Sequence, residues 1–194
     1  MGEPRISGYE FGRAPRSPVS LDELKELEAT VGFTDADRAC LRRVGELLNG
    51  EVEALVDGWR KIIGSQPHLA RWFFGPDHQP DEAYKAAVKA RFVRWVHDVF
   101  TRPFDQAWLD YQEEIGLRHT PAKKNTTDQA HTPPLVPLRH LIGFVAPVAE
   151  SVRHRLQAKG LSPDELDRLH AAWIKAVILS VTLWSHPYTR DGLW

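Results

Sequence analysis

Apolar residues recur every three or four positions along most of this chain, which is the period of amphipathic α-helices. With the residues that start and stop helices, this pattern predicts helices over residues 20–30, 34–63, 80–99, 103–119, 133–159 and 162–185. No stretch alternates with the period of two that marks a half-buried strand. The sequence therefore predicts an all-α fold.

Capping residues mark three of the predicted helix starts, at Ser20, Thr34 and Ser162. Ser20 is followed three residues later by Glu23, and Ser162 by Glu165, with Pro163 at the first helical position. In such a capping box the serine hydroxyl accepts a hydrogen bond from the amide three residues on, and the glutamate reaches back. These signals fix the starts of the first and last helices.

The first 19 residues form an arm instead of a helix, because prolines and glycines interrupt any period. Tyr9 and Phe11 within the arm indicate that it lies against the body of the protein. We expect the chain to be divided into an N-terminal arm, residues 1–19, and a single domain, residues 20–194.

Composition narrows the class of protein. The 194 residues carry 25 Lys and Arg against 26 Asp and Glu, so no basic excess points to a nucleic-acid partner. The single cysteine, Cys40, excludes an internal disulfide and a cysteine-rich zinc module. The longest apolar stretch, residues 171–184, is too short to span a membrane, and no signal peptide precedes residue 20. We expect a soluble cytoplasmic protein.

The candidate chemistry lies in residues 105–119. Trp108, Tyr111, Ile115 and His119 stand on one helical face, so an imidazole ends an apolar stripe. Spacing alone leaves two interpretations, a histidine bound to the last helical carbonyls and a histidine that binds a metal. Phosphate-binding loops, zinc-binding histidine pairs and serine nucleophile elbows are absent from the sequence.

Two aromatic residues lie on the inward faces of other helices. Trp59 follows the apolar line of residues 34–63, and Phe92 that of residues 80–99. Core packing alone explains both positions. Together with His119, however, they predict an apolar cavity with aromatic walls and one imidazole, which is what a haem requires.

Long runs of the sequence resemble the protoglobins, single-domain haem proteins of archaea and bacteria that are related to the globin domains of globin-coupled sensors. The resemblance covers essentially the whole chain. The runs that carry it are Gly8-Tyr9, residues 64–69 (GSQPHL), 91–95 (RFVRW), 104–119 (FDQAWLDYQEEIGLRH), 123–125 (KKN) and 183–188 (LWSHPY).

The resemblance implies an expanded globin fold, a three-over-three helical sandwich with an extra N-terminal helix and an N-terminal arm. It also implies a buried haem b and a homodimer formed through the last helices. Matched residue by residue, His119 is the expected iron ligand, and Trp59 and Phe92 are the aromatics on the opposite, ligand-binding side. The other residues that we expect to contact the haem are Arg60, Phe73, Tyr84, Val88, Arg91 and Phe144.

Arg60 departs from the family pattern, because many members carry a tyrosine directly after the tryptophan. A phenol there can donate a hydrogen bond to bound O2, and this chain lacks it. Adjacent helical residues point about 100° apart, so Trp59 and Arg60 cannot both face the iron without distortion. An outward Arg60 leaves an apolar site, and an inward Arg60 favours anionic ligands.

The function that follows from the resemblance is reversible binding of a diatomic gas (O2, CO or NO) at a five-coordinate iron held by His119. An alternative is a haem enzyme on the same fold with NO dioxygenase, nitrite reductase or peroxidase-type activity. Another is a gas sensor that acts through a separate protein. If the resemblance to protoglobins is set aside, a helical interaction domain without haem is the interpretation that remains.

Overall fold

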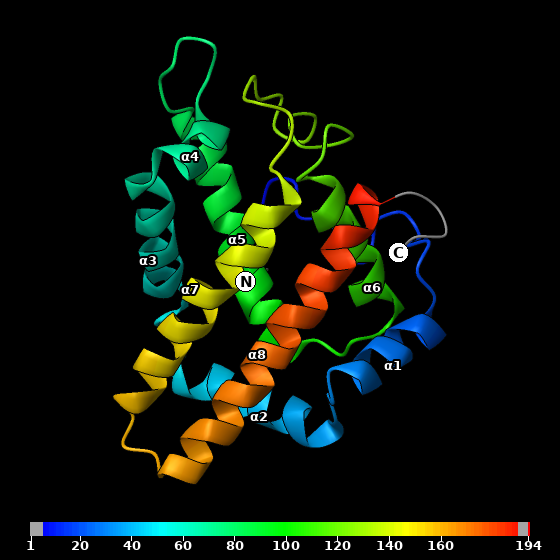
Figure 1. Ribbon diagram of the computed structural model, residues 1–194, viewed down its shortest axis with the longest axis vertical. Helices are drawn as coiled ribbons and strands as arrows, with labels where there is room; N and C mark the ends of the chain where they lie inside the picture. Colours follow the sequence, from blue (N-terminus) through cyan, green and yellow to red (C-terminus); the bar gives the residue numbers. More distant parts are fainter. Residues whose placement is uncertain (1–5, 190–193) are drawn as a thin grey trace.

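The computed structural model describes residues 6–189 and residue 194. Its helices, shown in Figure 1, are α1 (Leu21–Thr30), α2 (Asp35–Leu47), α3 (Val52–Ser65), α4 (Pro67–Ala70), the 3-10 helix η1 (Arg71–Phe73), α5 (Glu82–Thr101), α6 (Gln106–Leu117), α7 (Leu138–Gln157), α8 (Pro163–Ser185) and the 3-10 helix η2 (His186–Tyr188). Across the described residues the extended structure is limited to one isolated bridge, between Phe74 and Pro80. The predicted all-α class is confirmed.

Ser20 and Ser162 are the N-cap residues of α1 and α8 as predicted, and of these two helix starts α1 has the complete capping box. The Ser20 hydroxyl accepts from the amide of Glu23, and the Glu23 carboxylate accepts from the amide of Ser20. The Ser162 hydroxyl accepts from the amide of Glu165 at 3.2 Å. N-capping also explains why α6 begins at Gln106 and not at the predicted residue 103. The carboxylate of Asp105 accepts from the amide of Trp108, so Asp105 is the N-cap.

The prediction of one continuous helix over residues 34–63 is wrong, because the chain turns between α2 and α3. Gly50 at the turn has a φ of +80°, a left-handed conformation that glycine adopts without strain. Val44, Leu48 and Val52 are all at most 2% exposed, so apolar residues on both sides of the turn face one core. The helical spacing of apolar residues is therefore kept across the turn. The Asn49-Gly50 pair is the local sequence feature that marks it.

The described helices pack in layers around a core rich in aromatic residues. Figure 1 shows α7 and α8 crossing the front of the molecule, α3 and α6 on opposite sides of α5 behind them, and α1 and α2 at the lower end. Trp59, Trp108 and Trp173 are fully buried in this core. No helix in the described part of the chain has both the length and the apolar composition needed to cross a membrane.

The described part of the arm lies against α5 and α6. Tyr9 donates a hydrogen bond to the carboxylate of Asp98, at 2.6 Å, and its ring meets the Tyr111 ring edge-on at a centroid distance of 5.2 Å. Asp98 is 2% exposed, so the arm contributes to the burial of a carboxylate on α5. These contacts hold the arm beside the upper half of the bundle.

Candidate functional site

A cavity of about 230 Å³ lies between α3, α4, η1, α5, α6, α7, α8 and the connection from α6 to α7. With the exception of Trp59, the residues singled out from the sequence all line it. They are Arg60, Phe73, Tyr84, Val88, Arg91, Phe92, His119 and Phe144. These residues from α3, η1, α5, α7 and the α6–α7 connection thus converge on one space, although their contact with a cofactor stays a prediction.

Trp59 lies behind the cavity wall instead of in it. Its side chain is fully buried, its indole Nε1 donates to the hydroxyl of Ser151 at 2.5 Å, and its ring is 5.0 Å from that of Phe92. Phe92 does line the cavity, so Trp59 supports the wall through Phe92. Helical spacing marks both residues as inward and does not distinguish a wall residue from the layer behind it.

His119 follows α6 directly, two residues after its last residue, Leu117. Its Nδ1 lies 2.8 Å from the carbonyl oxygen of Ile115. A carbonyl can only accept, so Nδ1 carries the proton and the lone pair of Nε2 stays free. Burial lowers the pKa of His119 to about 4, which keeps the imidazole neutral at neutral pH. The two interpretations of this residue are therefore compatible, because Nδ1 binds a helix carbonyl while Nε2 can bind a metal.

Neighbouring groups fix the position of His119. The Trp184 ring stacks on the imidazole at a centroid distance of 5.9 Å, and its Nε1 donates to the side-chain oxygen of Gln112. A Cβ at Gly116 would lie 3.0 Å from the Trp184 backbone, so glycine permits this close approach of α6 and α8. The Tyr188 hydroxyl lies 3.2 Å from the carbonyl oxygen of His119. The histidine is thus held by contacts on several sides.

Two arginines at the upper end of the cavity are engaged in ion pairs. Arg91 donates from both terminal nitrogens to the Asp128 carboxylate and also to the carbonyl of Ser7. Arg118 donates to Glu114 at 2.9 Å. Arg91 was expected to contact the haem, and in the structure its guanidinium already pairs with the Asp128 carboxylate.

Lys124 is a cavity residue that sequence reasoning missed as a candidate. It is 3% exposed, and its ammonium group donates to the carbonyl of Trp72 at 2.9 Å and to the hydroxyl of Thr132 at 2.6 Å. Burial lowers its pKa to about 8, and burial also raises the pKa of the adjacent Tyr84 phenol to about 12. The KKN run was the available signal, but a sequence does not distinguish a buried lysine from an exposed one.

Arg60 lies at the α3–α5 side of the cavity. Its Nη2 donates to the carbonyl of Lys85 at 3.3 Å, and its Nη1 is 3.7 Å from a carboxylate oxygen of Asp57. The guanidinium is therefore anchored on α5 and α3, although the residue as a whole lines the cavity.

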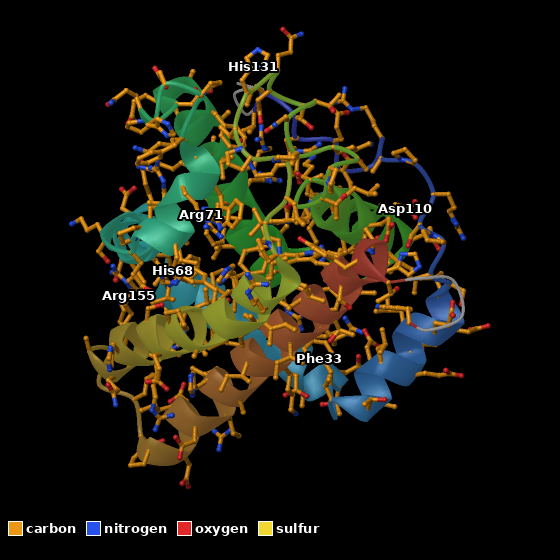
Figure 2. The ribbon with its side chains drawn as sticks, turned by 45° about the horizontal axis from the view of Figure 1, so that its top comes forward. Phe33, His68, Arg71, Asp110, His131 and Arg155 are labelled. Carbon is orange, nitrogen blue, oxygen red and sulfur yellow. The ribbon has the colours of Figure 1, made fainter. Side chains whose placement is uncertain are left out.

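Of the other histidines, His140 is the one that lines this cavity, and His170 is buried elsewhere, between α7 and α8. The His140 ring lies 5.5 Å from that of His68, which is exposed on α4. Figure 2 shows His131 at the outer edge of the molecule, on the connection between α6 and α7. In the described ranges no group of three or more His, Cys, Asp or Glu could hold a metal ion.

The fold is that of a globin. A solved structure described as the globin domain of a globin-coupled sensor from Geobacter sulfurreducens matches this one with a TM-score of 0.68. The match covers 86% of this chain and 97% of that chain at 17% sequence identity, a level at which it shows the fold alone. The expected globin fold is confirmed.

Residues 20–194 match the family model of the protoglobins, and the chain belongs to this family. It is therefore a haem-binding globin. A comparison with curated proteins gave no significant match.

The residues of the cavity fit a haem. The free Nε2 of a neutral, oriented imidazole is the nitrogen ligand that haem iron takes from a globin. Phe73, Phe92 and Phe144 give the cavity the flat apolar walls that a porphyrin needs. Lys124 adds a buried positive charge, which suits a cofactor that carries carboxylates.

Proposed function

We propose that this protoglobin holds haem b through His119 and reversibly binds a diatomic gas, O2, CO or NO. The observation that supports the proposal is the hydrogen bond from His119 Nδ1 to the carbonyl of Ile115, because it leaves Nε2 free beside an apolar cavity. When bound, the haem supplies an iron whose sixth coordination position is open to the gas.

The chain's own residues bind and orient the cofactor. Phe73, Phe92, Phe144 and Val88 line the cavity and would exclude water from a bound haem, and His119 would hold it through the free Nε2. The Tyr84 phenol, whose pKa is about 12, adds no charge to the wall at neutral pH. The part of the wall formed by the phenylalanines and Val88 is apolar, and such a surface favours neutral ligands over ions, since removing an ion from water is costly.

The α3–α5 side supports gas binding over the enzymatic alternative. Phe92 and the tryptophan behind it carry no group that exchanges protons at neutral pH. The charged cavity residues of these two helices, Arg60 on α3 and Arg91 on α5, are held by the Lys85 carbonyl and by Asp128, and a guanidinium stays protonated in proteins. We therefore assign Arg60 to the outward orientation. No contact in the described residues favours the gas-sensor alternative over simple binding.

We also propose that the protein forms a homodimer through its last helices. Ile142 on α7 is 55% exposed and Ile178 on α8 is 39% exposed, both unusual for large apolar side chains. Sedimentation of the haem-loaded protein tests this, and we expect a dimer that Ile178→Glu converts to a monomer. A wild-type monomer at micromolar concentration contradicts the proposal.

The experiment that tests the function is absorption spectroscopy of protein reconstituted with haem in the ferric, ferrous and ferrous-CO states. We expect a strong Soret band that shifts with CO in the wild type and is weak or altered in His119→Ala. His140→Ala is the matched control, because it removes another imidazole that lines the same cavity. An unchanged His119→Ala spectrum, or a band lost in His140→Ala instead, overturns the assignment of the ligand.

A further inference from the structure

The cations around the cavity are not equivalent. Cationic side chains from α3, α5, α6 and the α6–α7 connection line it. The three arginines each lie within ion-pair distance of a carboxylate: Arg60 of Asp57, Arg91 of Asp128 and Arg118 of Glu114. Lys124 has no carboxylate at that distance anywhere in the described residues 6–189 and 194, so its charge is uncompensated.

The partners of Lys124 are all neutral. The ammonium group donates to the Trp72 carbonyl and the Thr132 hydroxyl and lies 5.0 Å from the centre of the Tyr84 ring. An ammonium has three donors, so these two acceptors leave one N–H for another group. Asn125 fixes the arrangement, because its side chain accepts from the Thr132 hydroxyl and donates to the Thr132 carbonyl. The cation is thus held in place before any ligand binds.

A buried charge without a counter-ion opposes folding, because the cost of removing the charge from water is not offset by an ion pair. Lys124 is 3% exposed and its pKa, although lowered, is about 8, so it is still charged at neutral pH. The neighbouring Lys123 differs: its side chain is 34% exposed and pairs with Glu114 at 2.6 Å. A preorganised, uncompensated cation in a cavity wall indicates that the ligand supplies the anion.

We propose that Lys124 binds a carboxylate of the haem and so fixes which edge of the ring faces the connection between α6 and α7. This assignment rests on the proposed function, since it requires that haem occupies the cavity. Haem b carries its two propionate carboxylates on one edge. Figure 1 shows this connection at the same end of the molecule as the start of α5 and the end of α6, so the carboxylate edge faces that end. Arg91 and Arg118, already paired, contribute less to the binding of this anion.

The test compares haem with its dimethyl ester, in which both carboxylates are neutral. Affinities are measured by titration of the haem-free wild type, Lys124→Met and Lys123→Met. We expect the wild type to prefer haem to the ester by at least about tenfold, the value of one charge-assisted hydrogen bond. Lys124→Met loses that preference by binding haem more weakly while its affinity for the ester is unchanged. Lys123→Met keeps the preference.

Each result decides the proposal. If Lys124→Met weakens haem and ester equally, the lysine is only structural and the proposal is overturned, as it is if neither affinity changes. Circular dichroism of the haem-free variants checks folding, and Lys124→Gln is the second variant should methionine disturb the connection. A wild type without a Soret band overturns the proposed function as well, whereas a wild type with normal haem and CO spectra but no preference overturns this inference alone.

Discussion

The two sides of the cavity are built in different ways. At the end of α6, His119 and Lys124 are held by hydrogen bonds to backbone and hydroxyl oxygens, and the nearby arginines are held by ion pairs. On the α3–α5 side, Trp59 and Phe92 are held by ring packing, with one hydrogen bond from the indole to Ser151. Figure 1 shows α3 and α6 on opposite sides of α5.

From this difference we expect one side of the cavity to determine cofactor binding and the other to determine the stability of the fold. Hydrogen bonds and charges at the α6 end orient groups that a cofactor needs, so changes there should alter affinity and spectra. Packed rings on the α3–α5 side supply buried apolar area, so changes there should alter the free energy of unfolding. Variants on each side test whether the two roles are in fact separate.

The largest effect is expected for Trp59→Ala. The indole is fully buried, and truncation of a buried aromatic residue costs about 3–5 kcal/mol of unfolding free energy. Because Trp59 does not line the cavity, the Soret band of the folded fraction should stay close to that of the wild type. Urea unfolding and the absorption spectrum check both statements. Ser151→Ala, which removes only the indole's acceptor, should cost about 1 kcal/mol. A Trp59→Ala protein of wild-type stability contradicts this division of roles.

His119→Gly should weaken haem binding at least about a hundredfold, since loss of even an outer partner of a metal ligand costs up to that factor. Added imidazole should restore the Soret band and CO binding, because it fills the space that the side chain leaves. Stability of the haem-free variant should change far less than in Trp59→Ala. Imidazole titration followed at the Soret band is the measurement. Failure of imidazole to restore the spectrum indicates that the histidine does not act as the iron ligand.

The sequence predicted the helices best where a cap and a period coincided. Ser20 and Ser162 located the starts of α1 and α8, because capping depends on residues within one turn. The turn between α2 and α3 was missed because apolar residues on both sides of Gly50 face one core and keep the same spacing. Local patterns report which side of a helix is buried and say less about where the helix stops.

The site was only partly predictable for a related reason. His119 and Phe92 could be named because each lies on the inward stripe of a helix. Lys124 lies in a polar connection without any period, and it is buried only because that connection folds over the start of α5. Burial of a charged loop residue is a tertiary property, and a sequence without an alignment gives no signal for it.

The next effect concerns the free energy of unfolding of the haem-free protein, compared between the wild type and Lys124→Met. In the folded state the pKa of Lys124 is about 8, against 10.5 for an exposed lysine. Below pH 8 both states are protonated and the burial penalty, ~3 kcal/mol, is fully present. Between pH 8 and 10.5 the unfolded chain binds a proton that the folded chain has lost, so wild-type stability rises with pH. Above that range the penalty is gone.

The variant should therefore be more stable than the wild type below pH 8, by ~1 kcal/mol, because the Trp72 carbonyl and the Thr132 hydroxyl each lose the lysine as a hydrogen-bond donor, which offsets part of the gain. Its advantage should disappear as the pH rises towards 10.5. Burial raises the pKa of Tyr84 from 10.0 to about 12, and because this residue is the same in both proteins, its own pH dependence cancels in their difference. Urea unfolding at pH 7 and pH 10 measures the difference. An advantage that is independent of pH contradicts a charged Lys124 in the folded protein.

The smallest effect is expected for Arg60→Leu, the variant that removes the charged cavity residue of α3. The guanidinium is anchored on the Lys85 carbonyl and Asp57, and the side chain is 28% exposed, so water screens its charge from the cavity. Azide, an anion that binds ferric haem, is the sensitive probe, and its affinity should change by less than about threefold. Arg60→Lys, which keeps a charge at the same position, is the control. A tenfold loss of azide affinity in Arg60→Leu alone indicates that the guanidinium turns inward when haem is bound. The two sides of the cavity would then both carry charge towards the ligand, and the enzymatic alternative would gain the ionic group that it lacks in this structure.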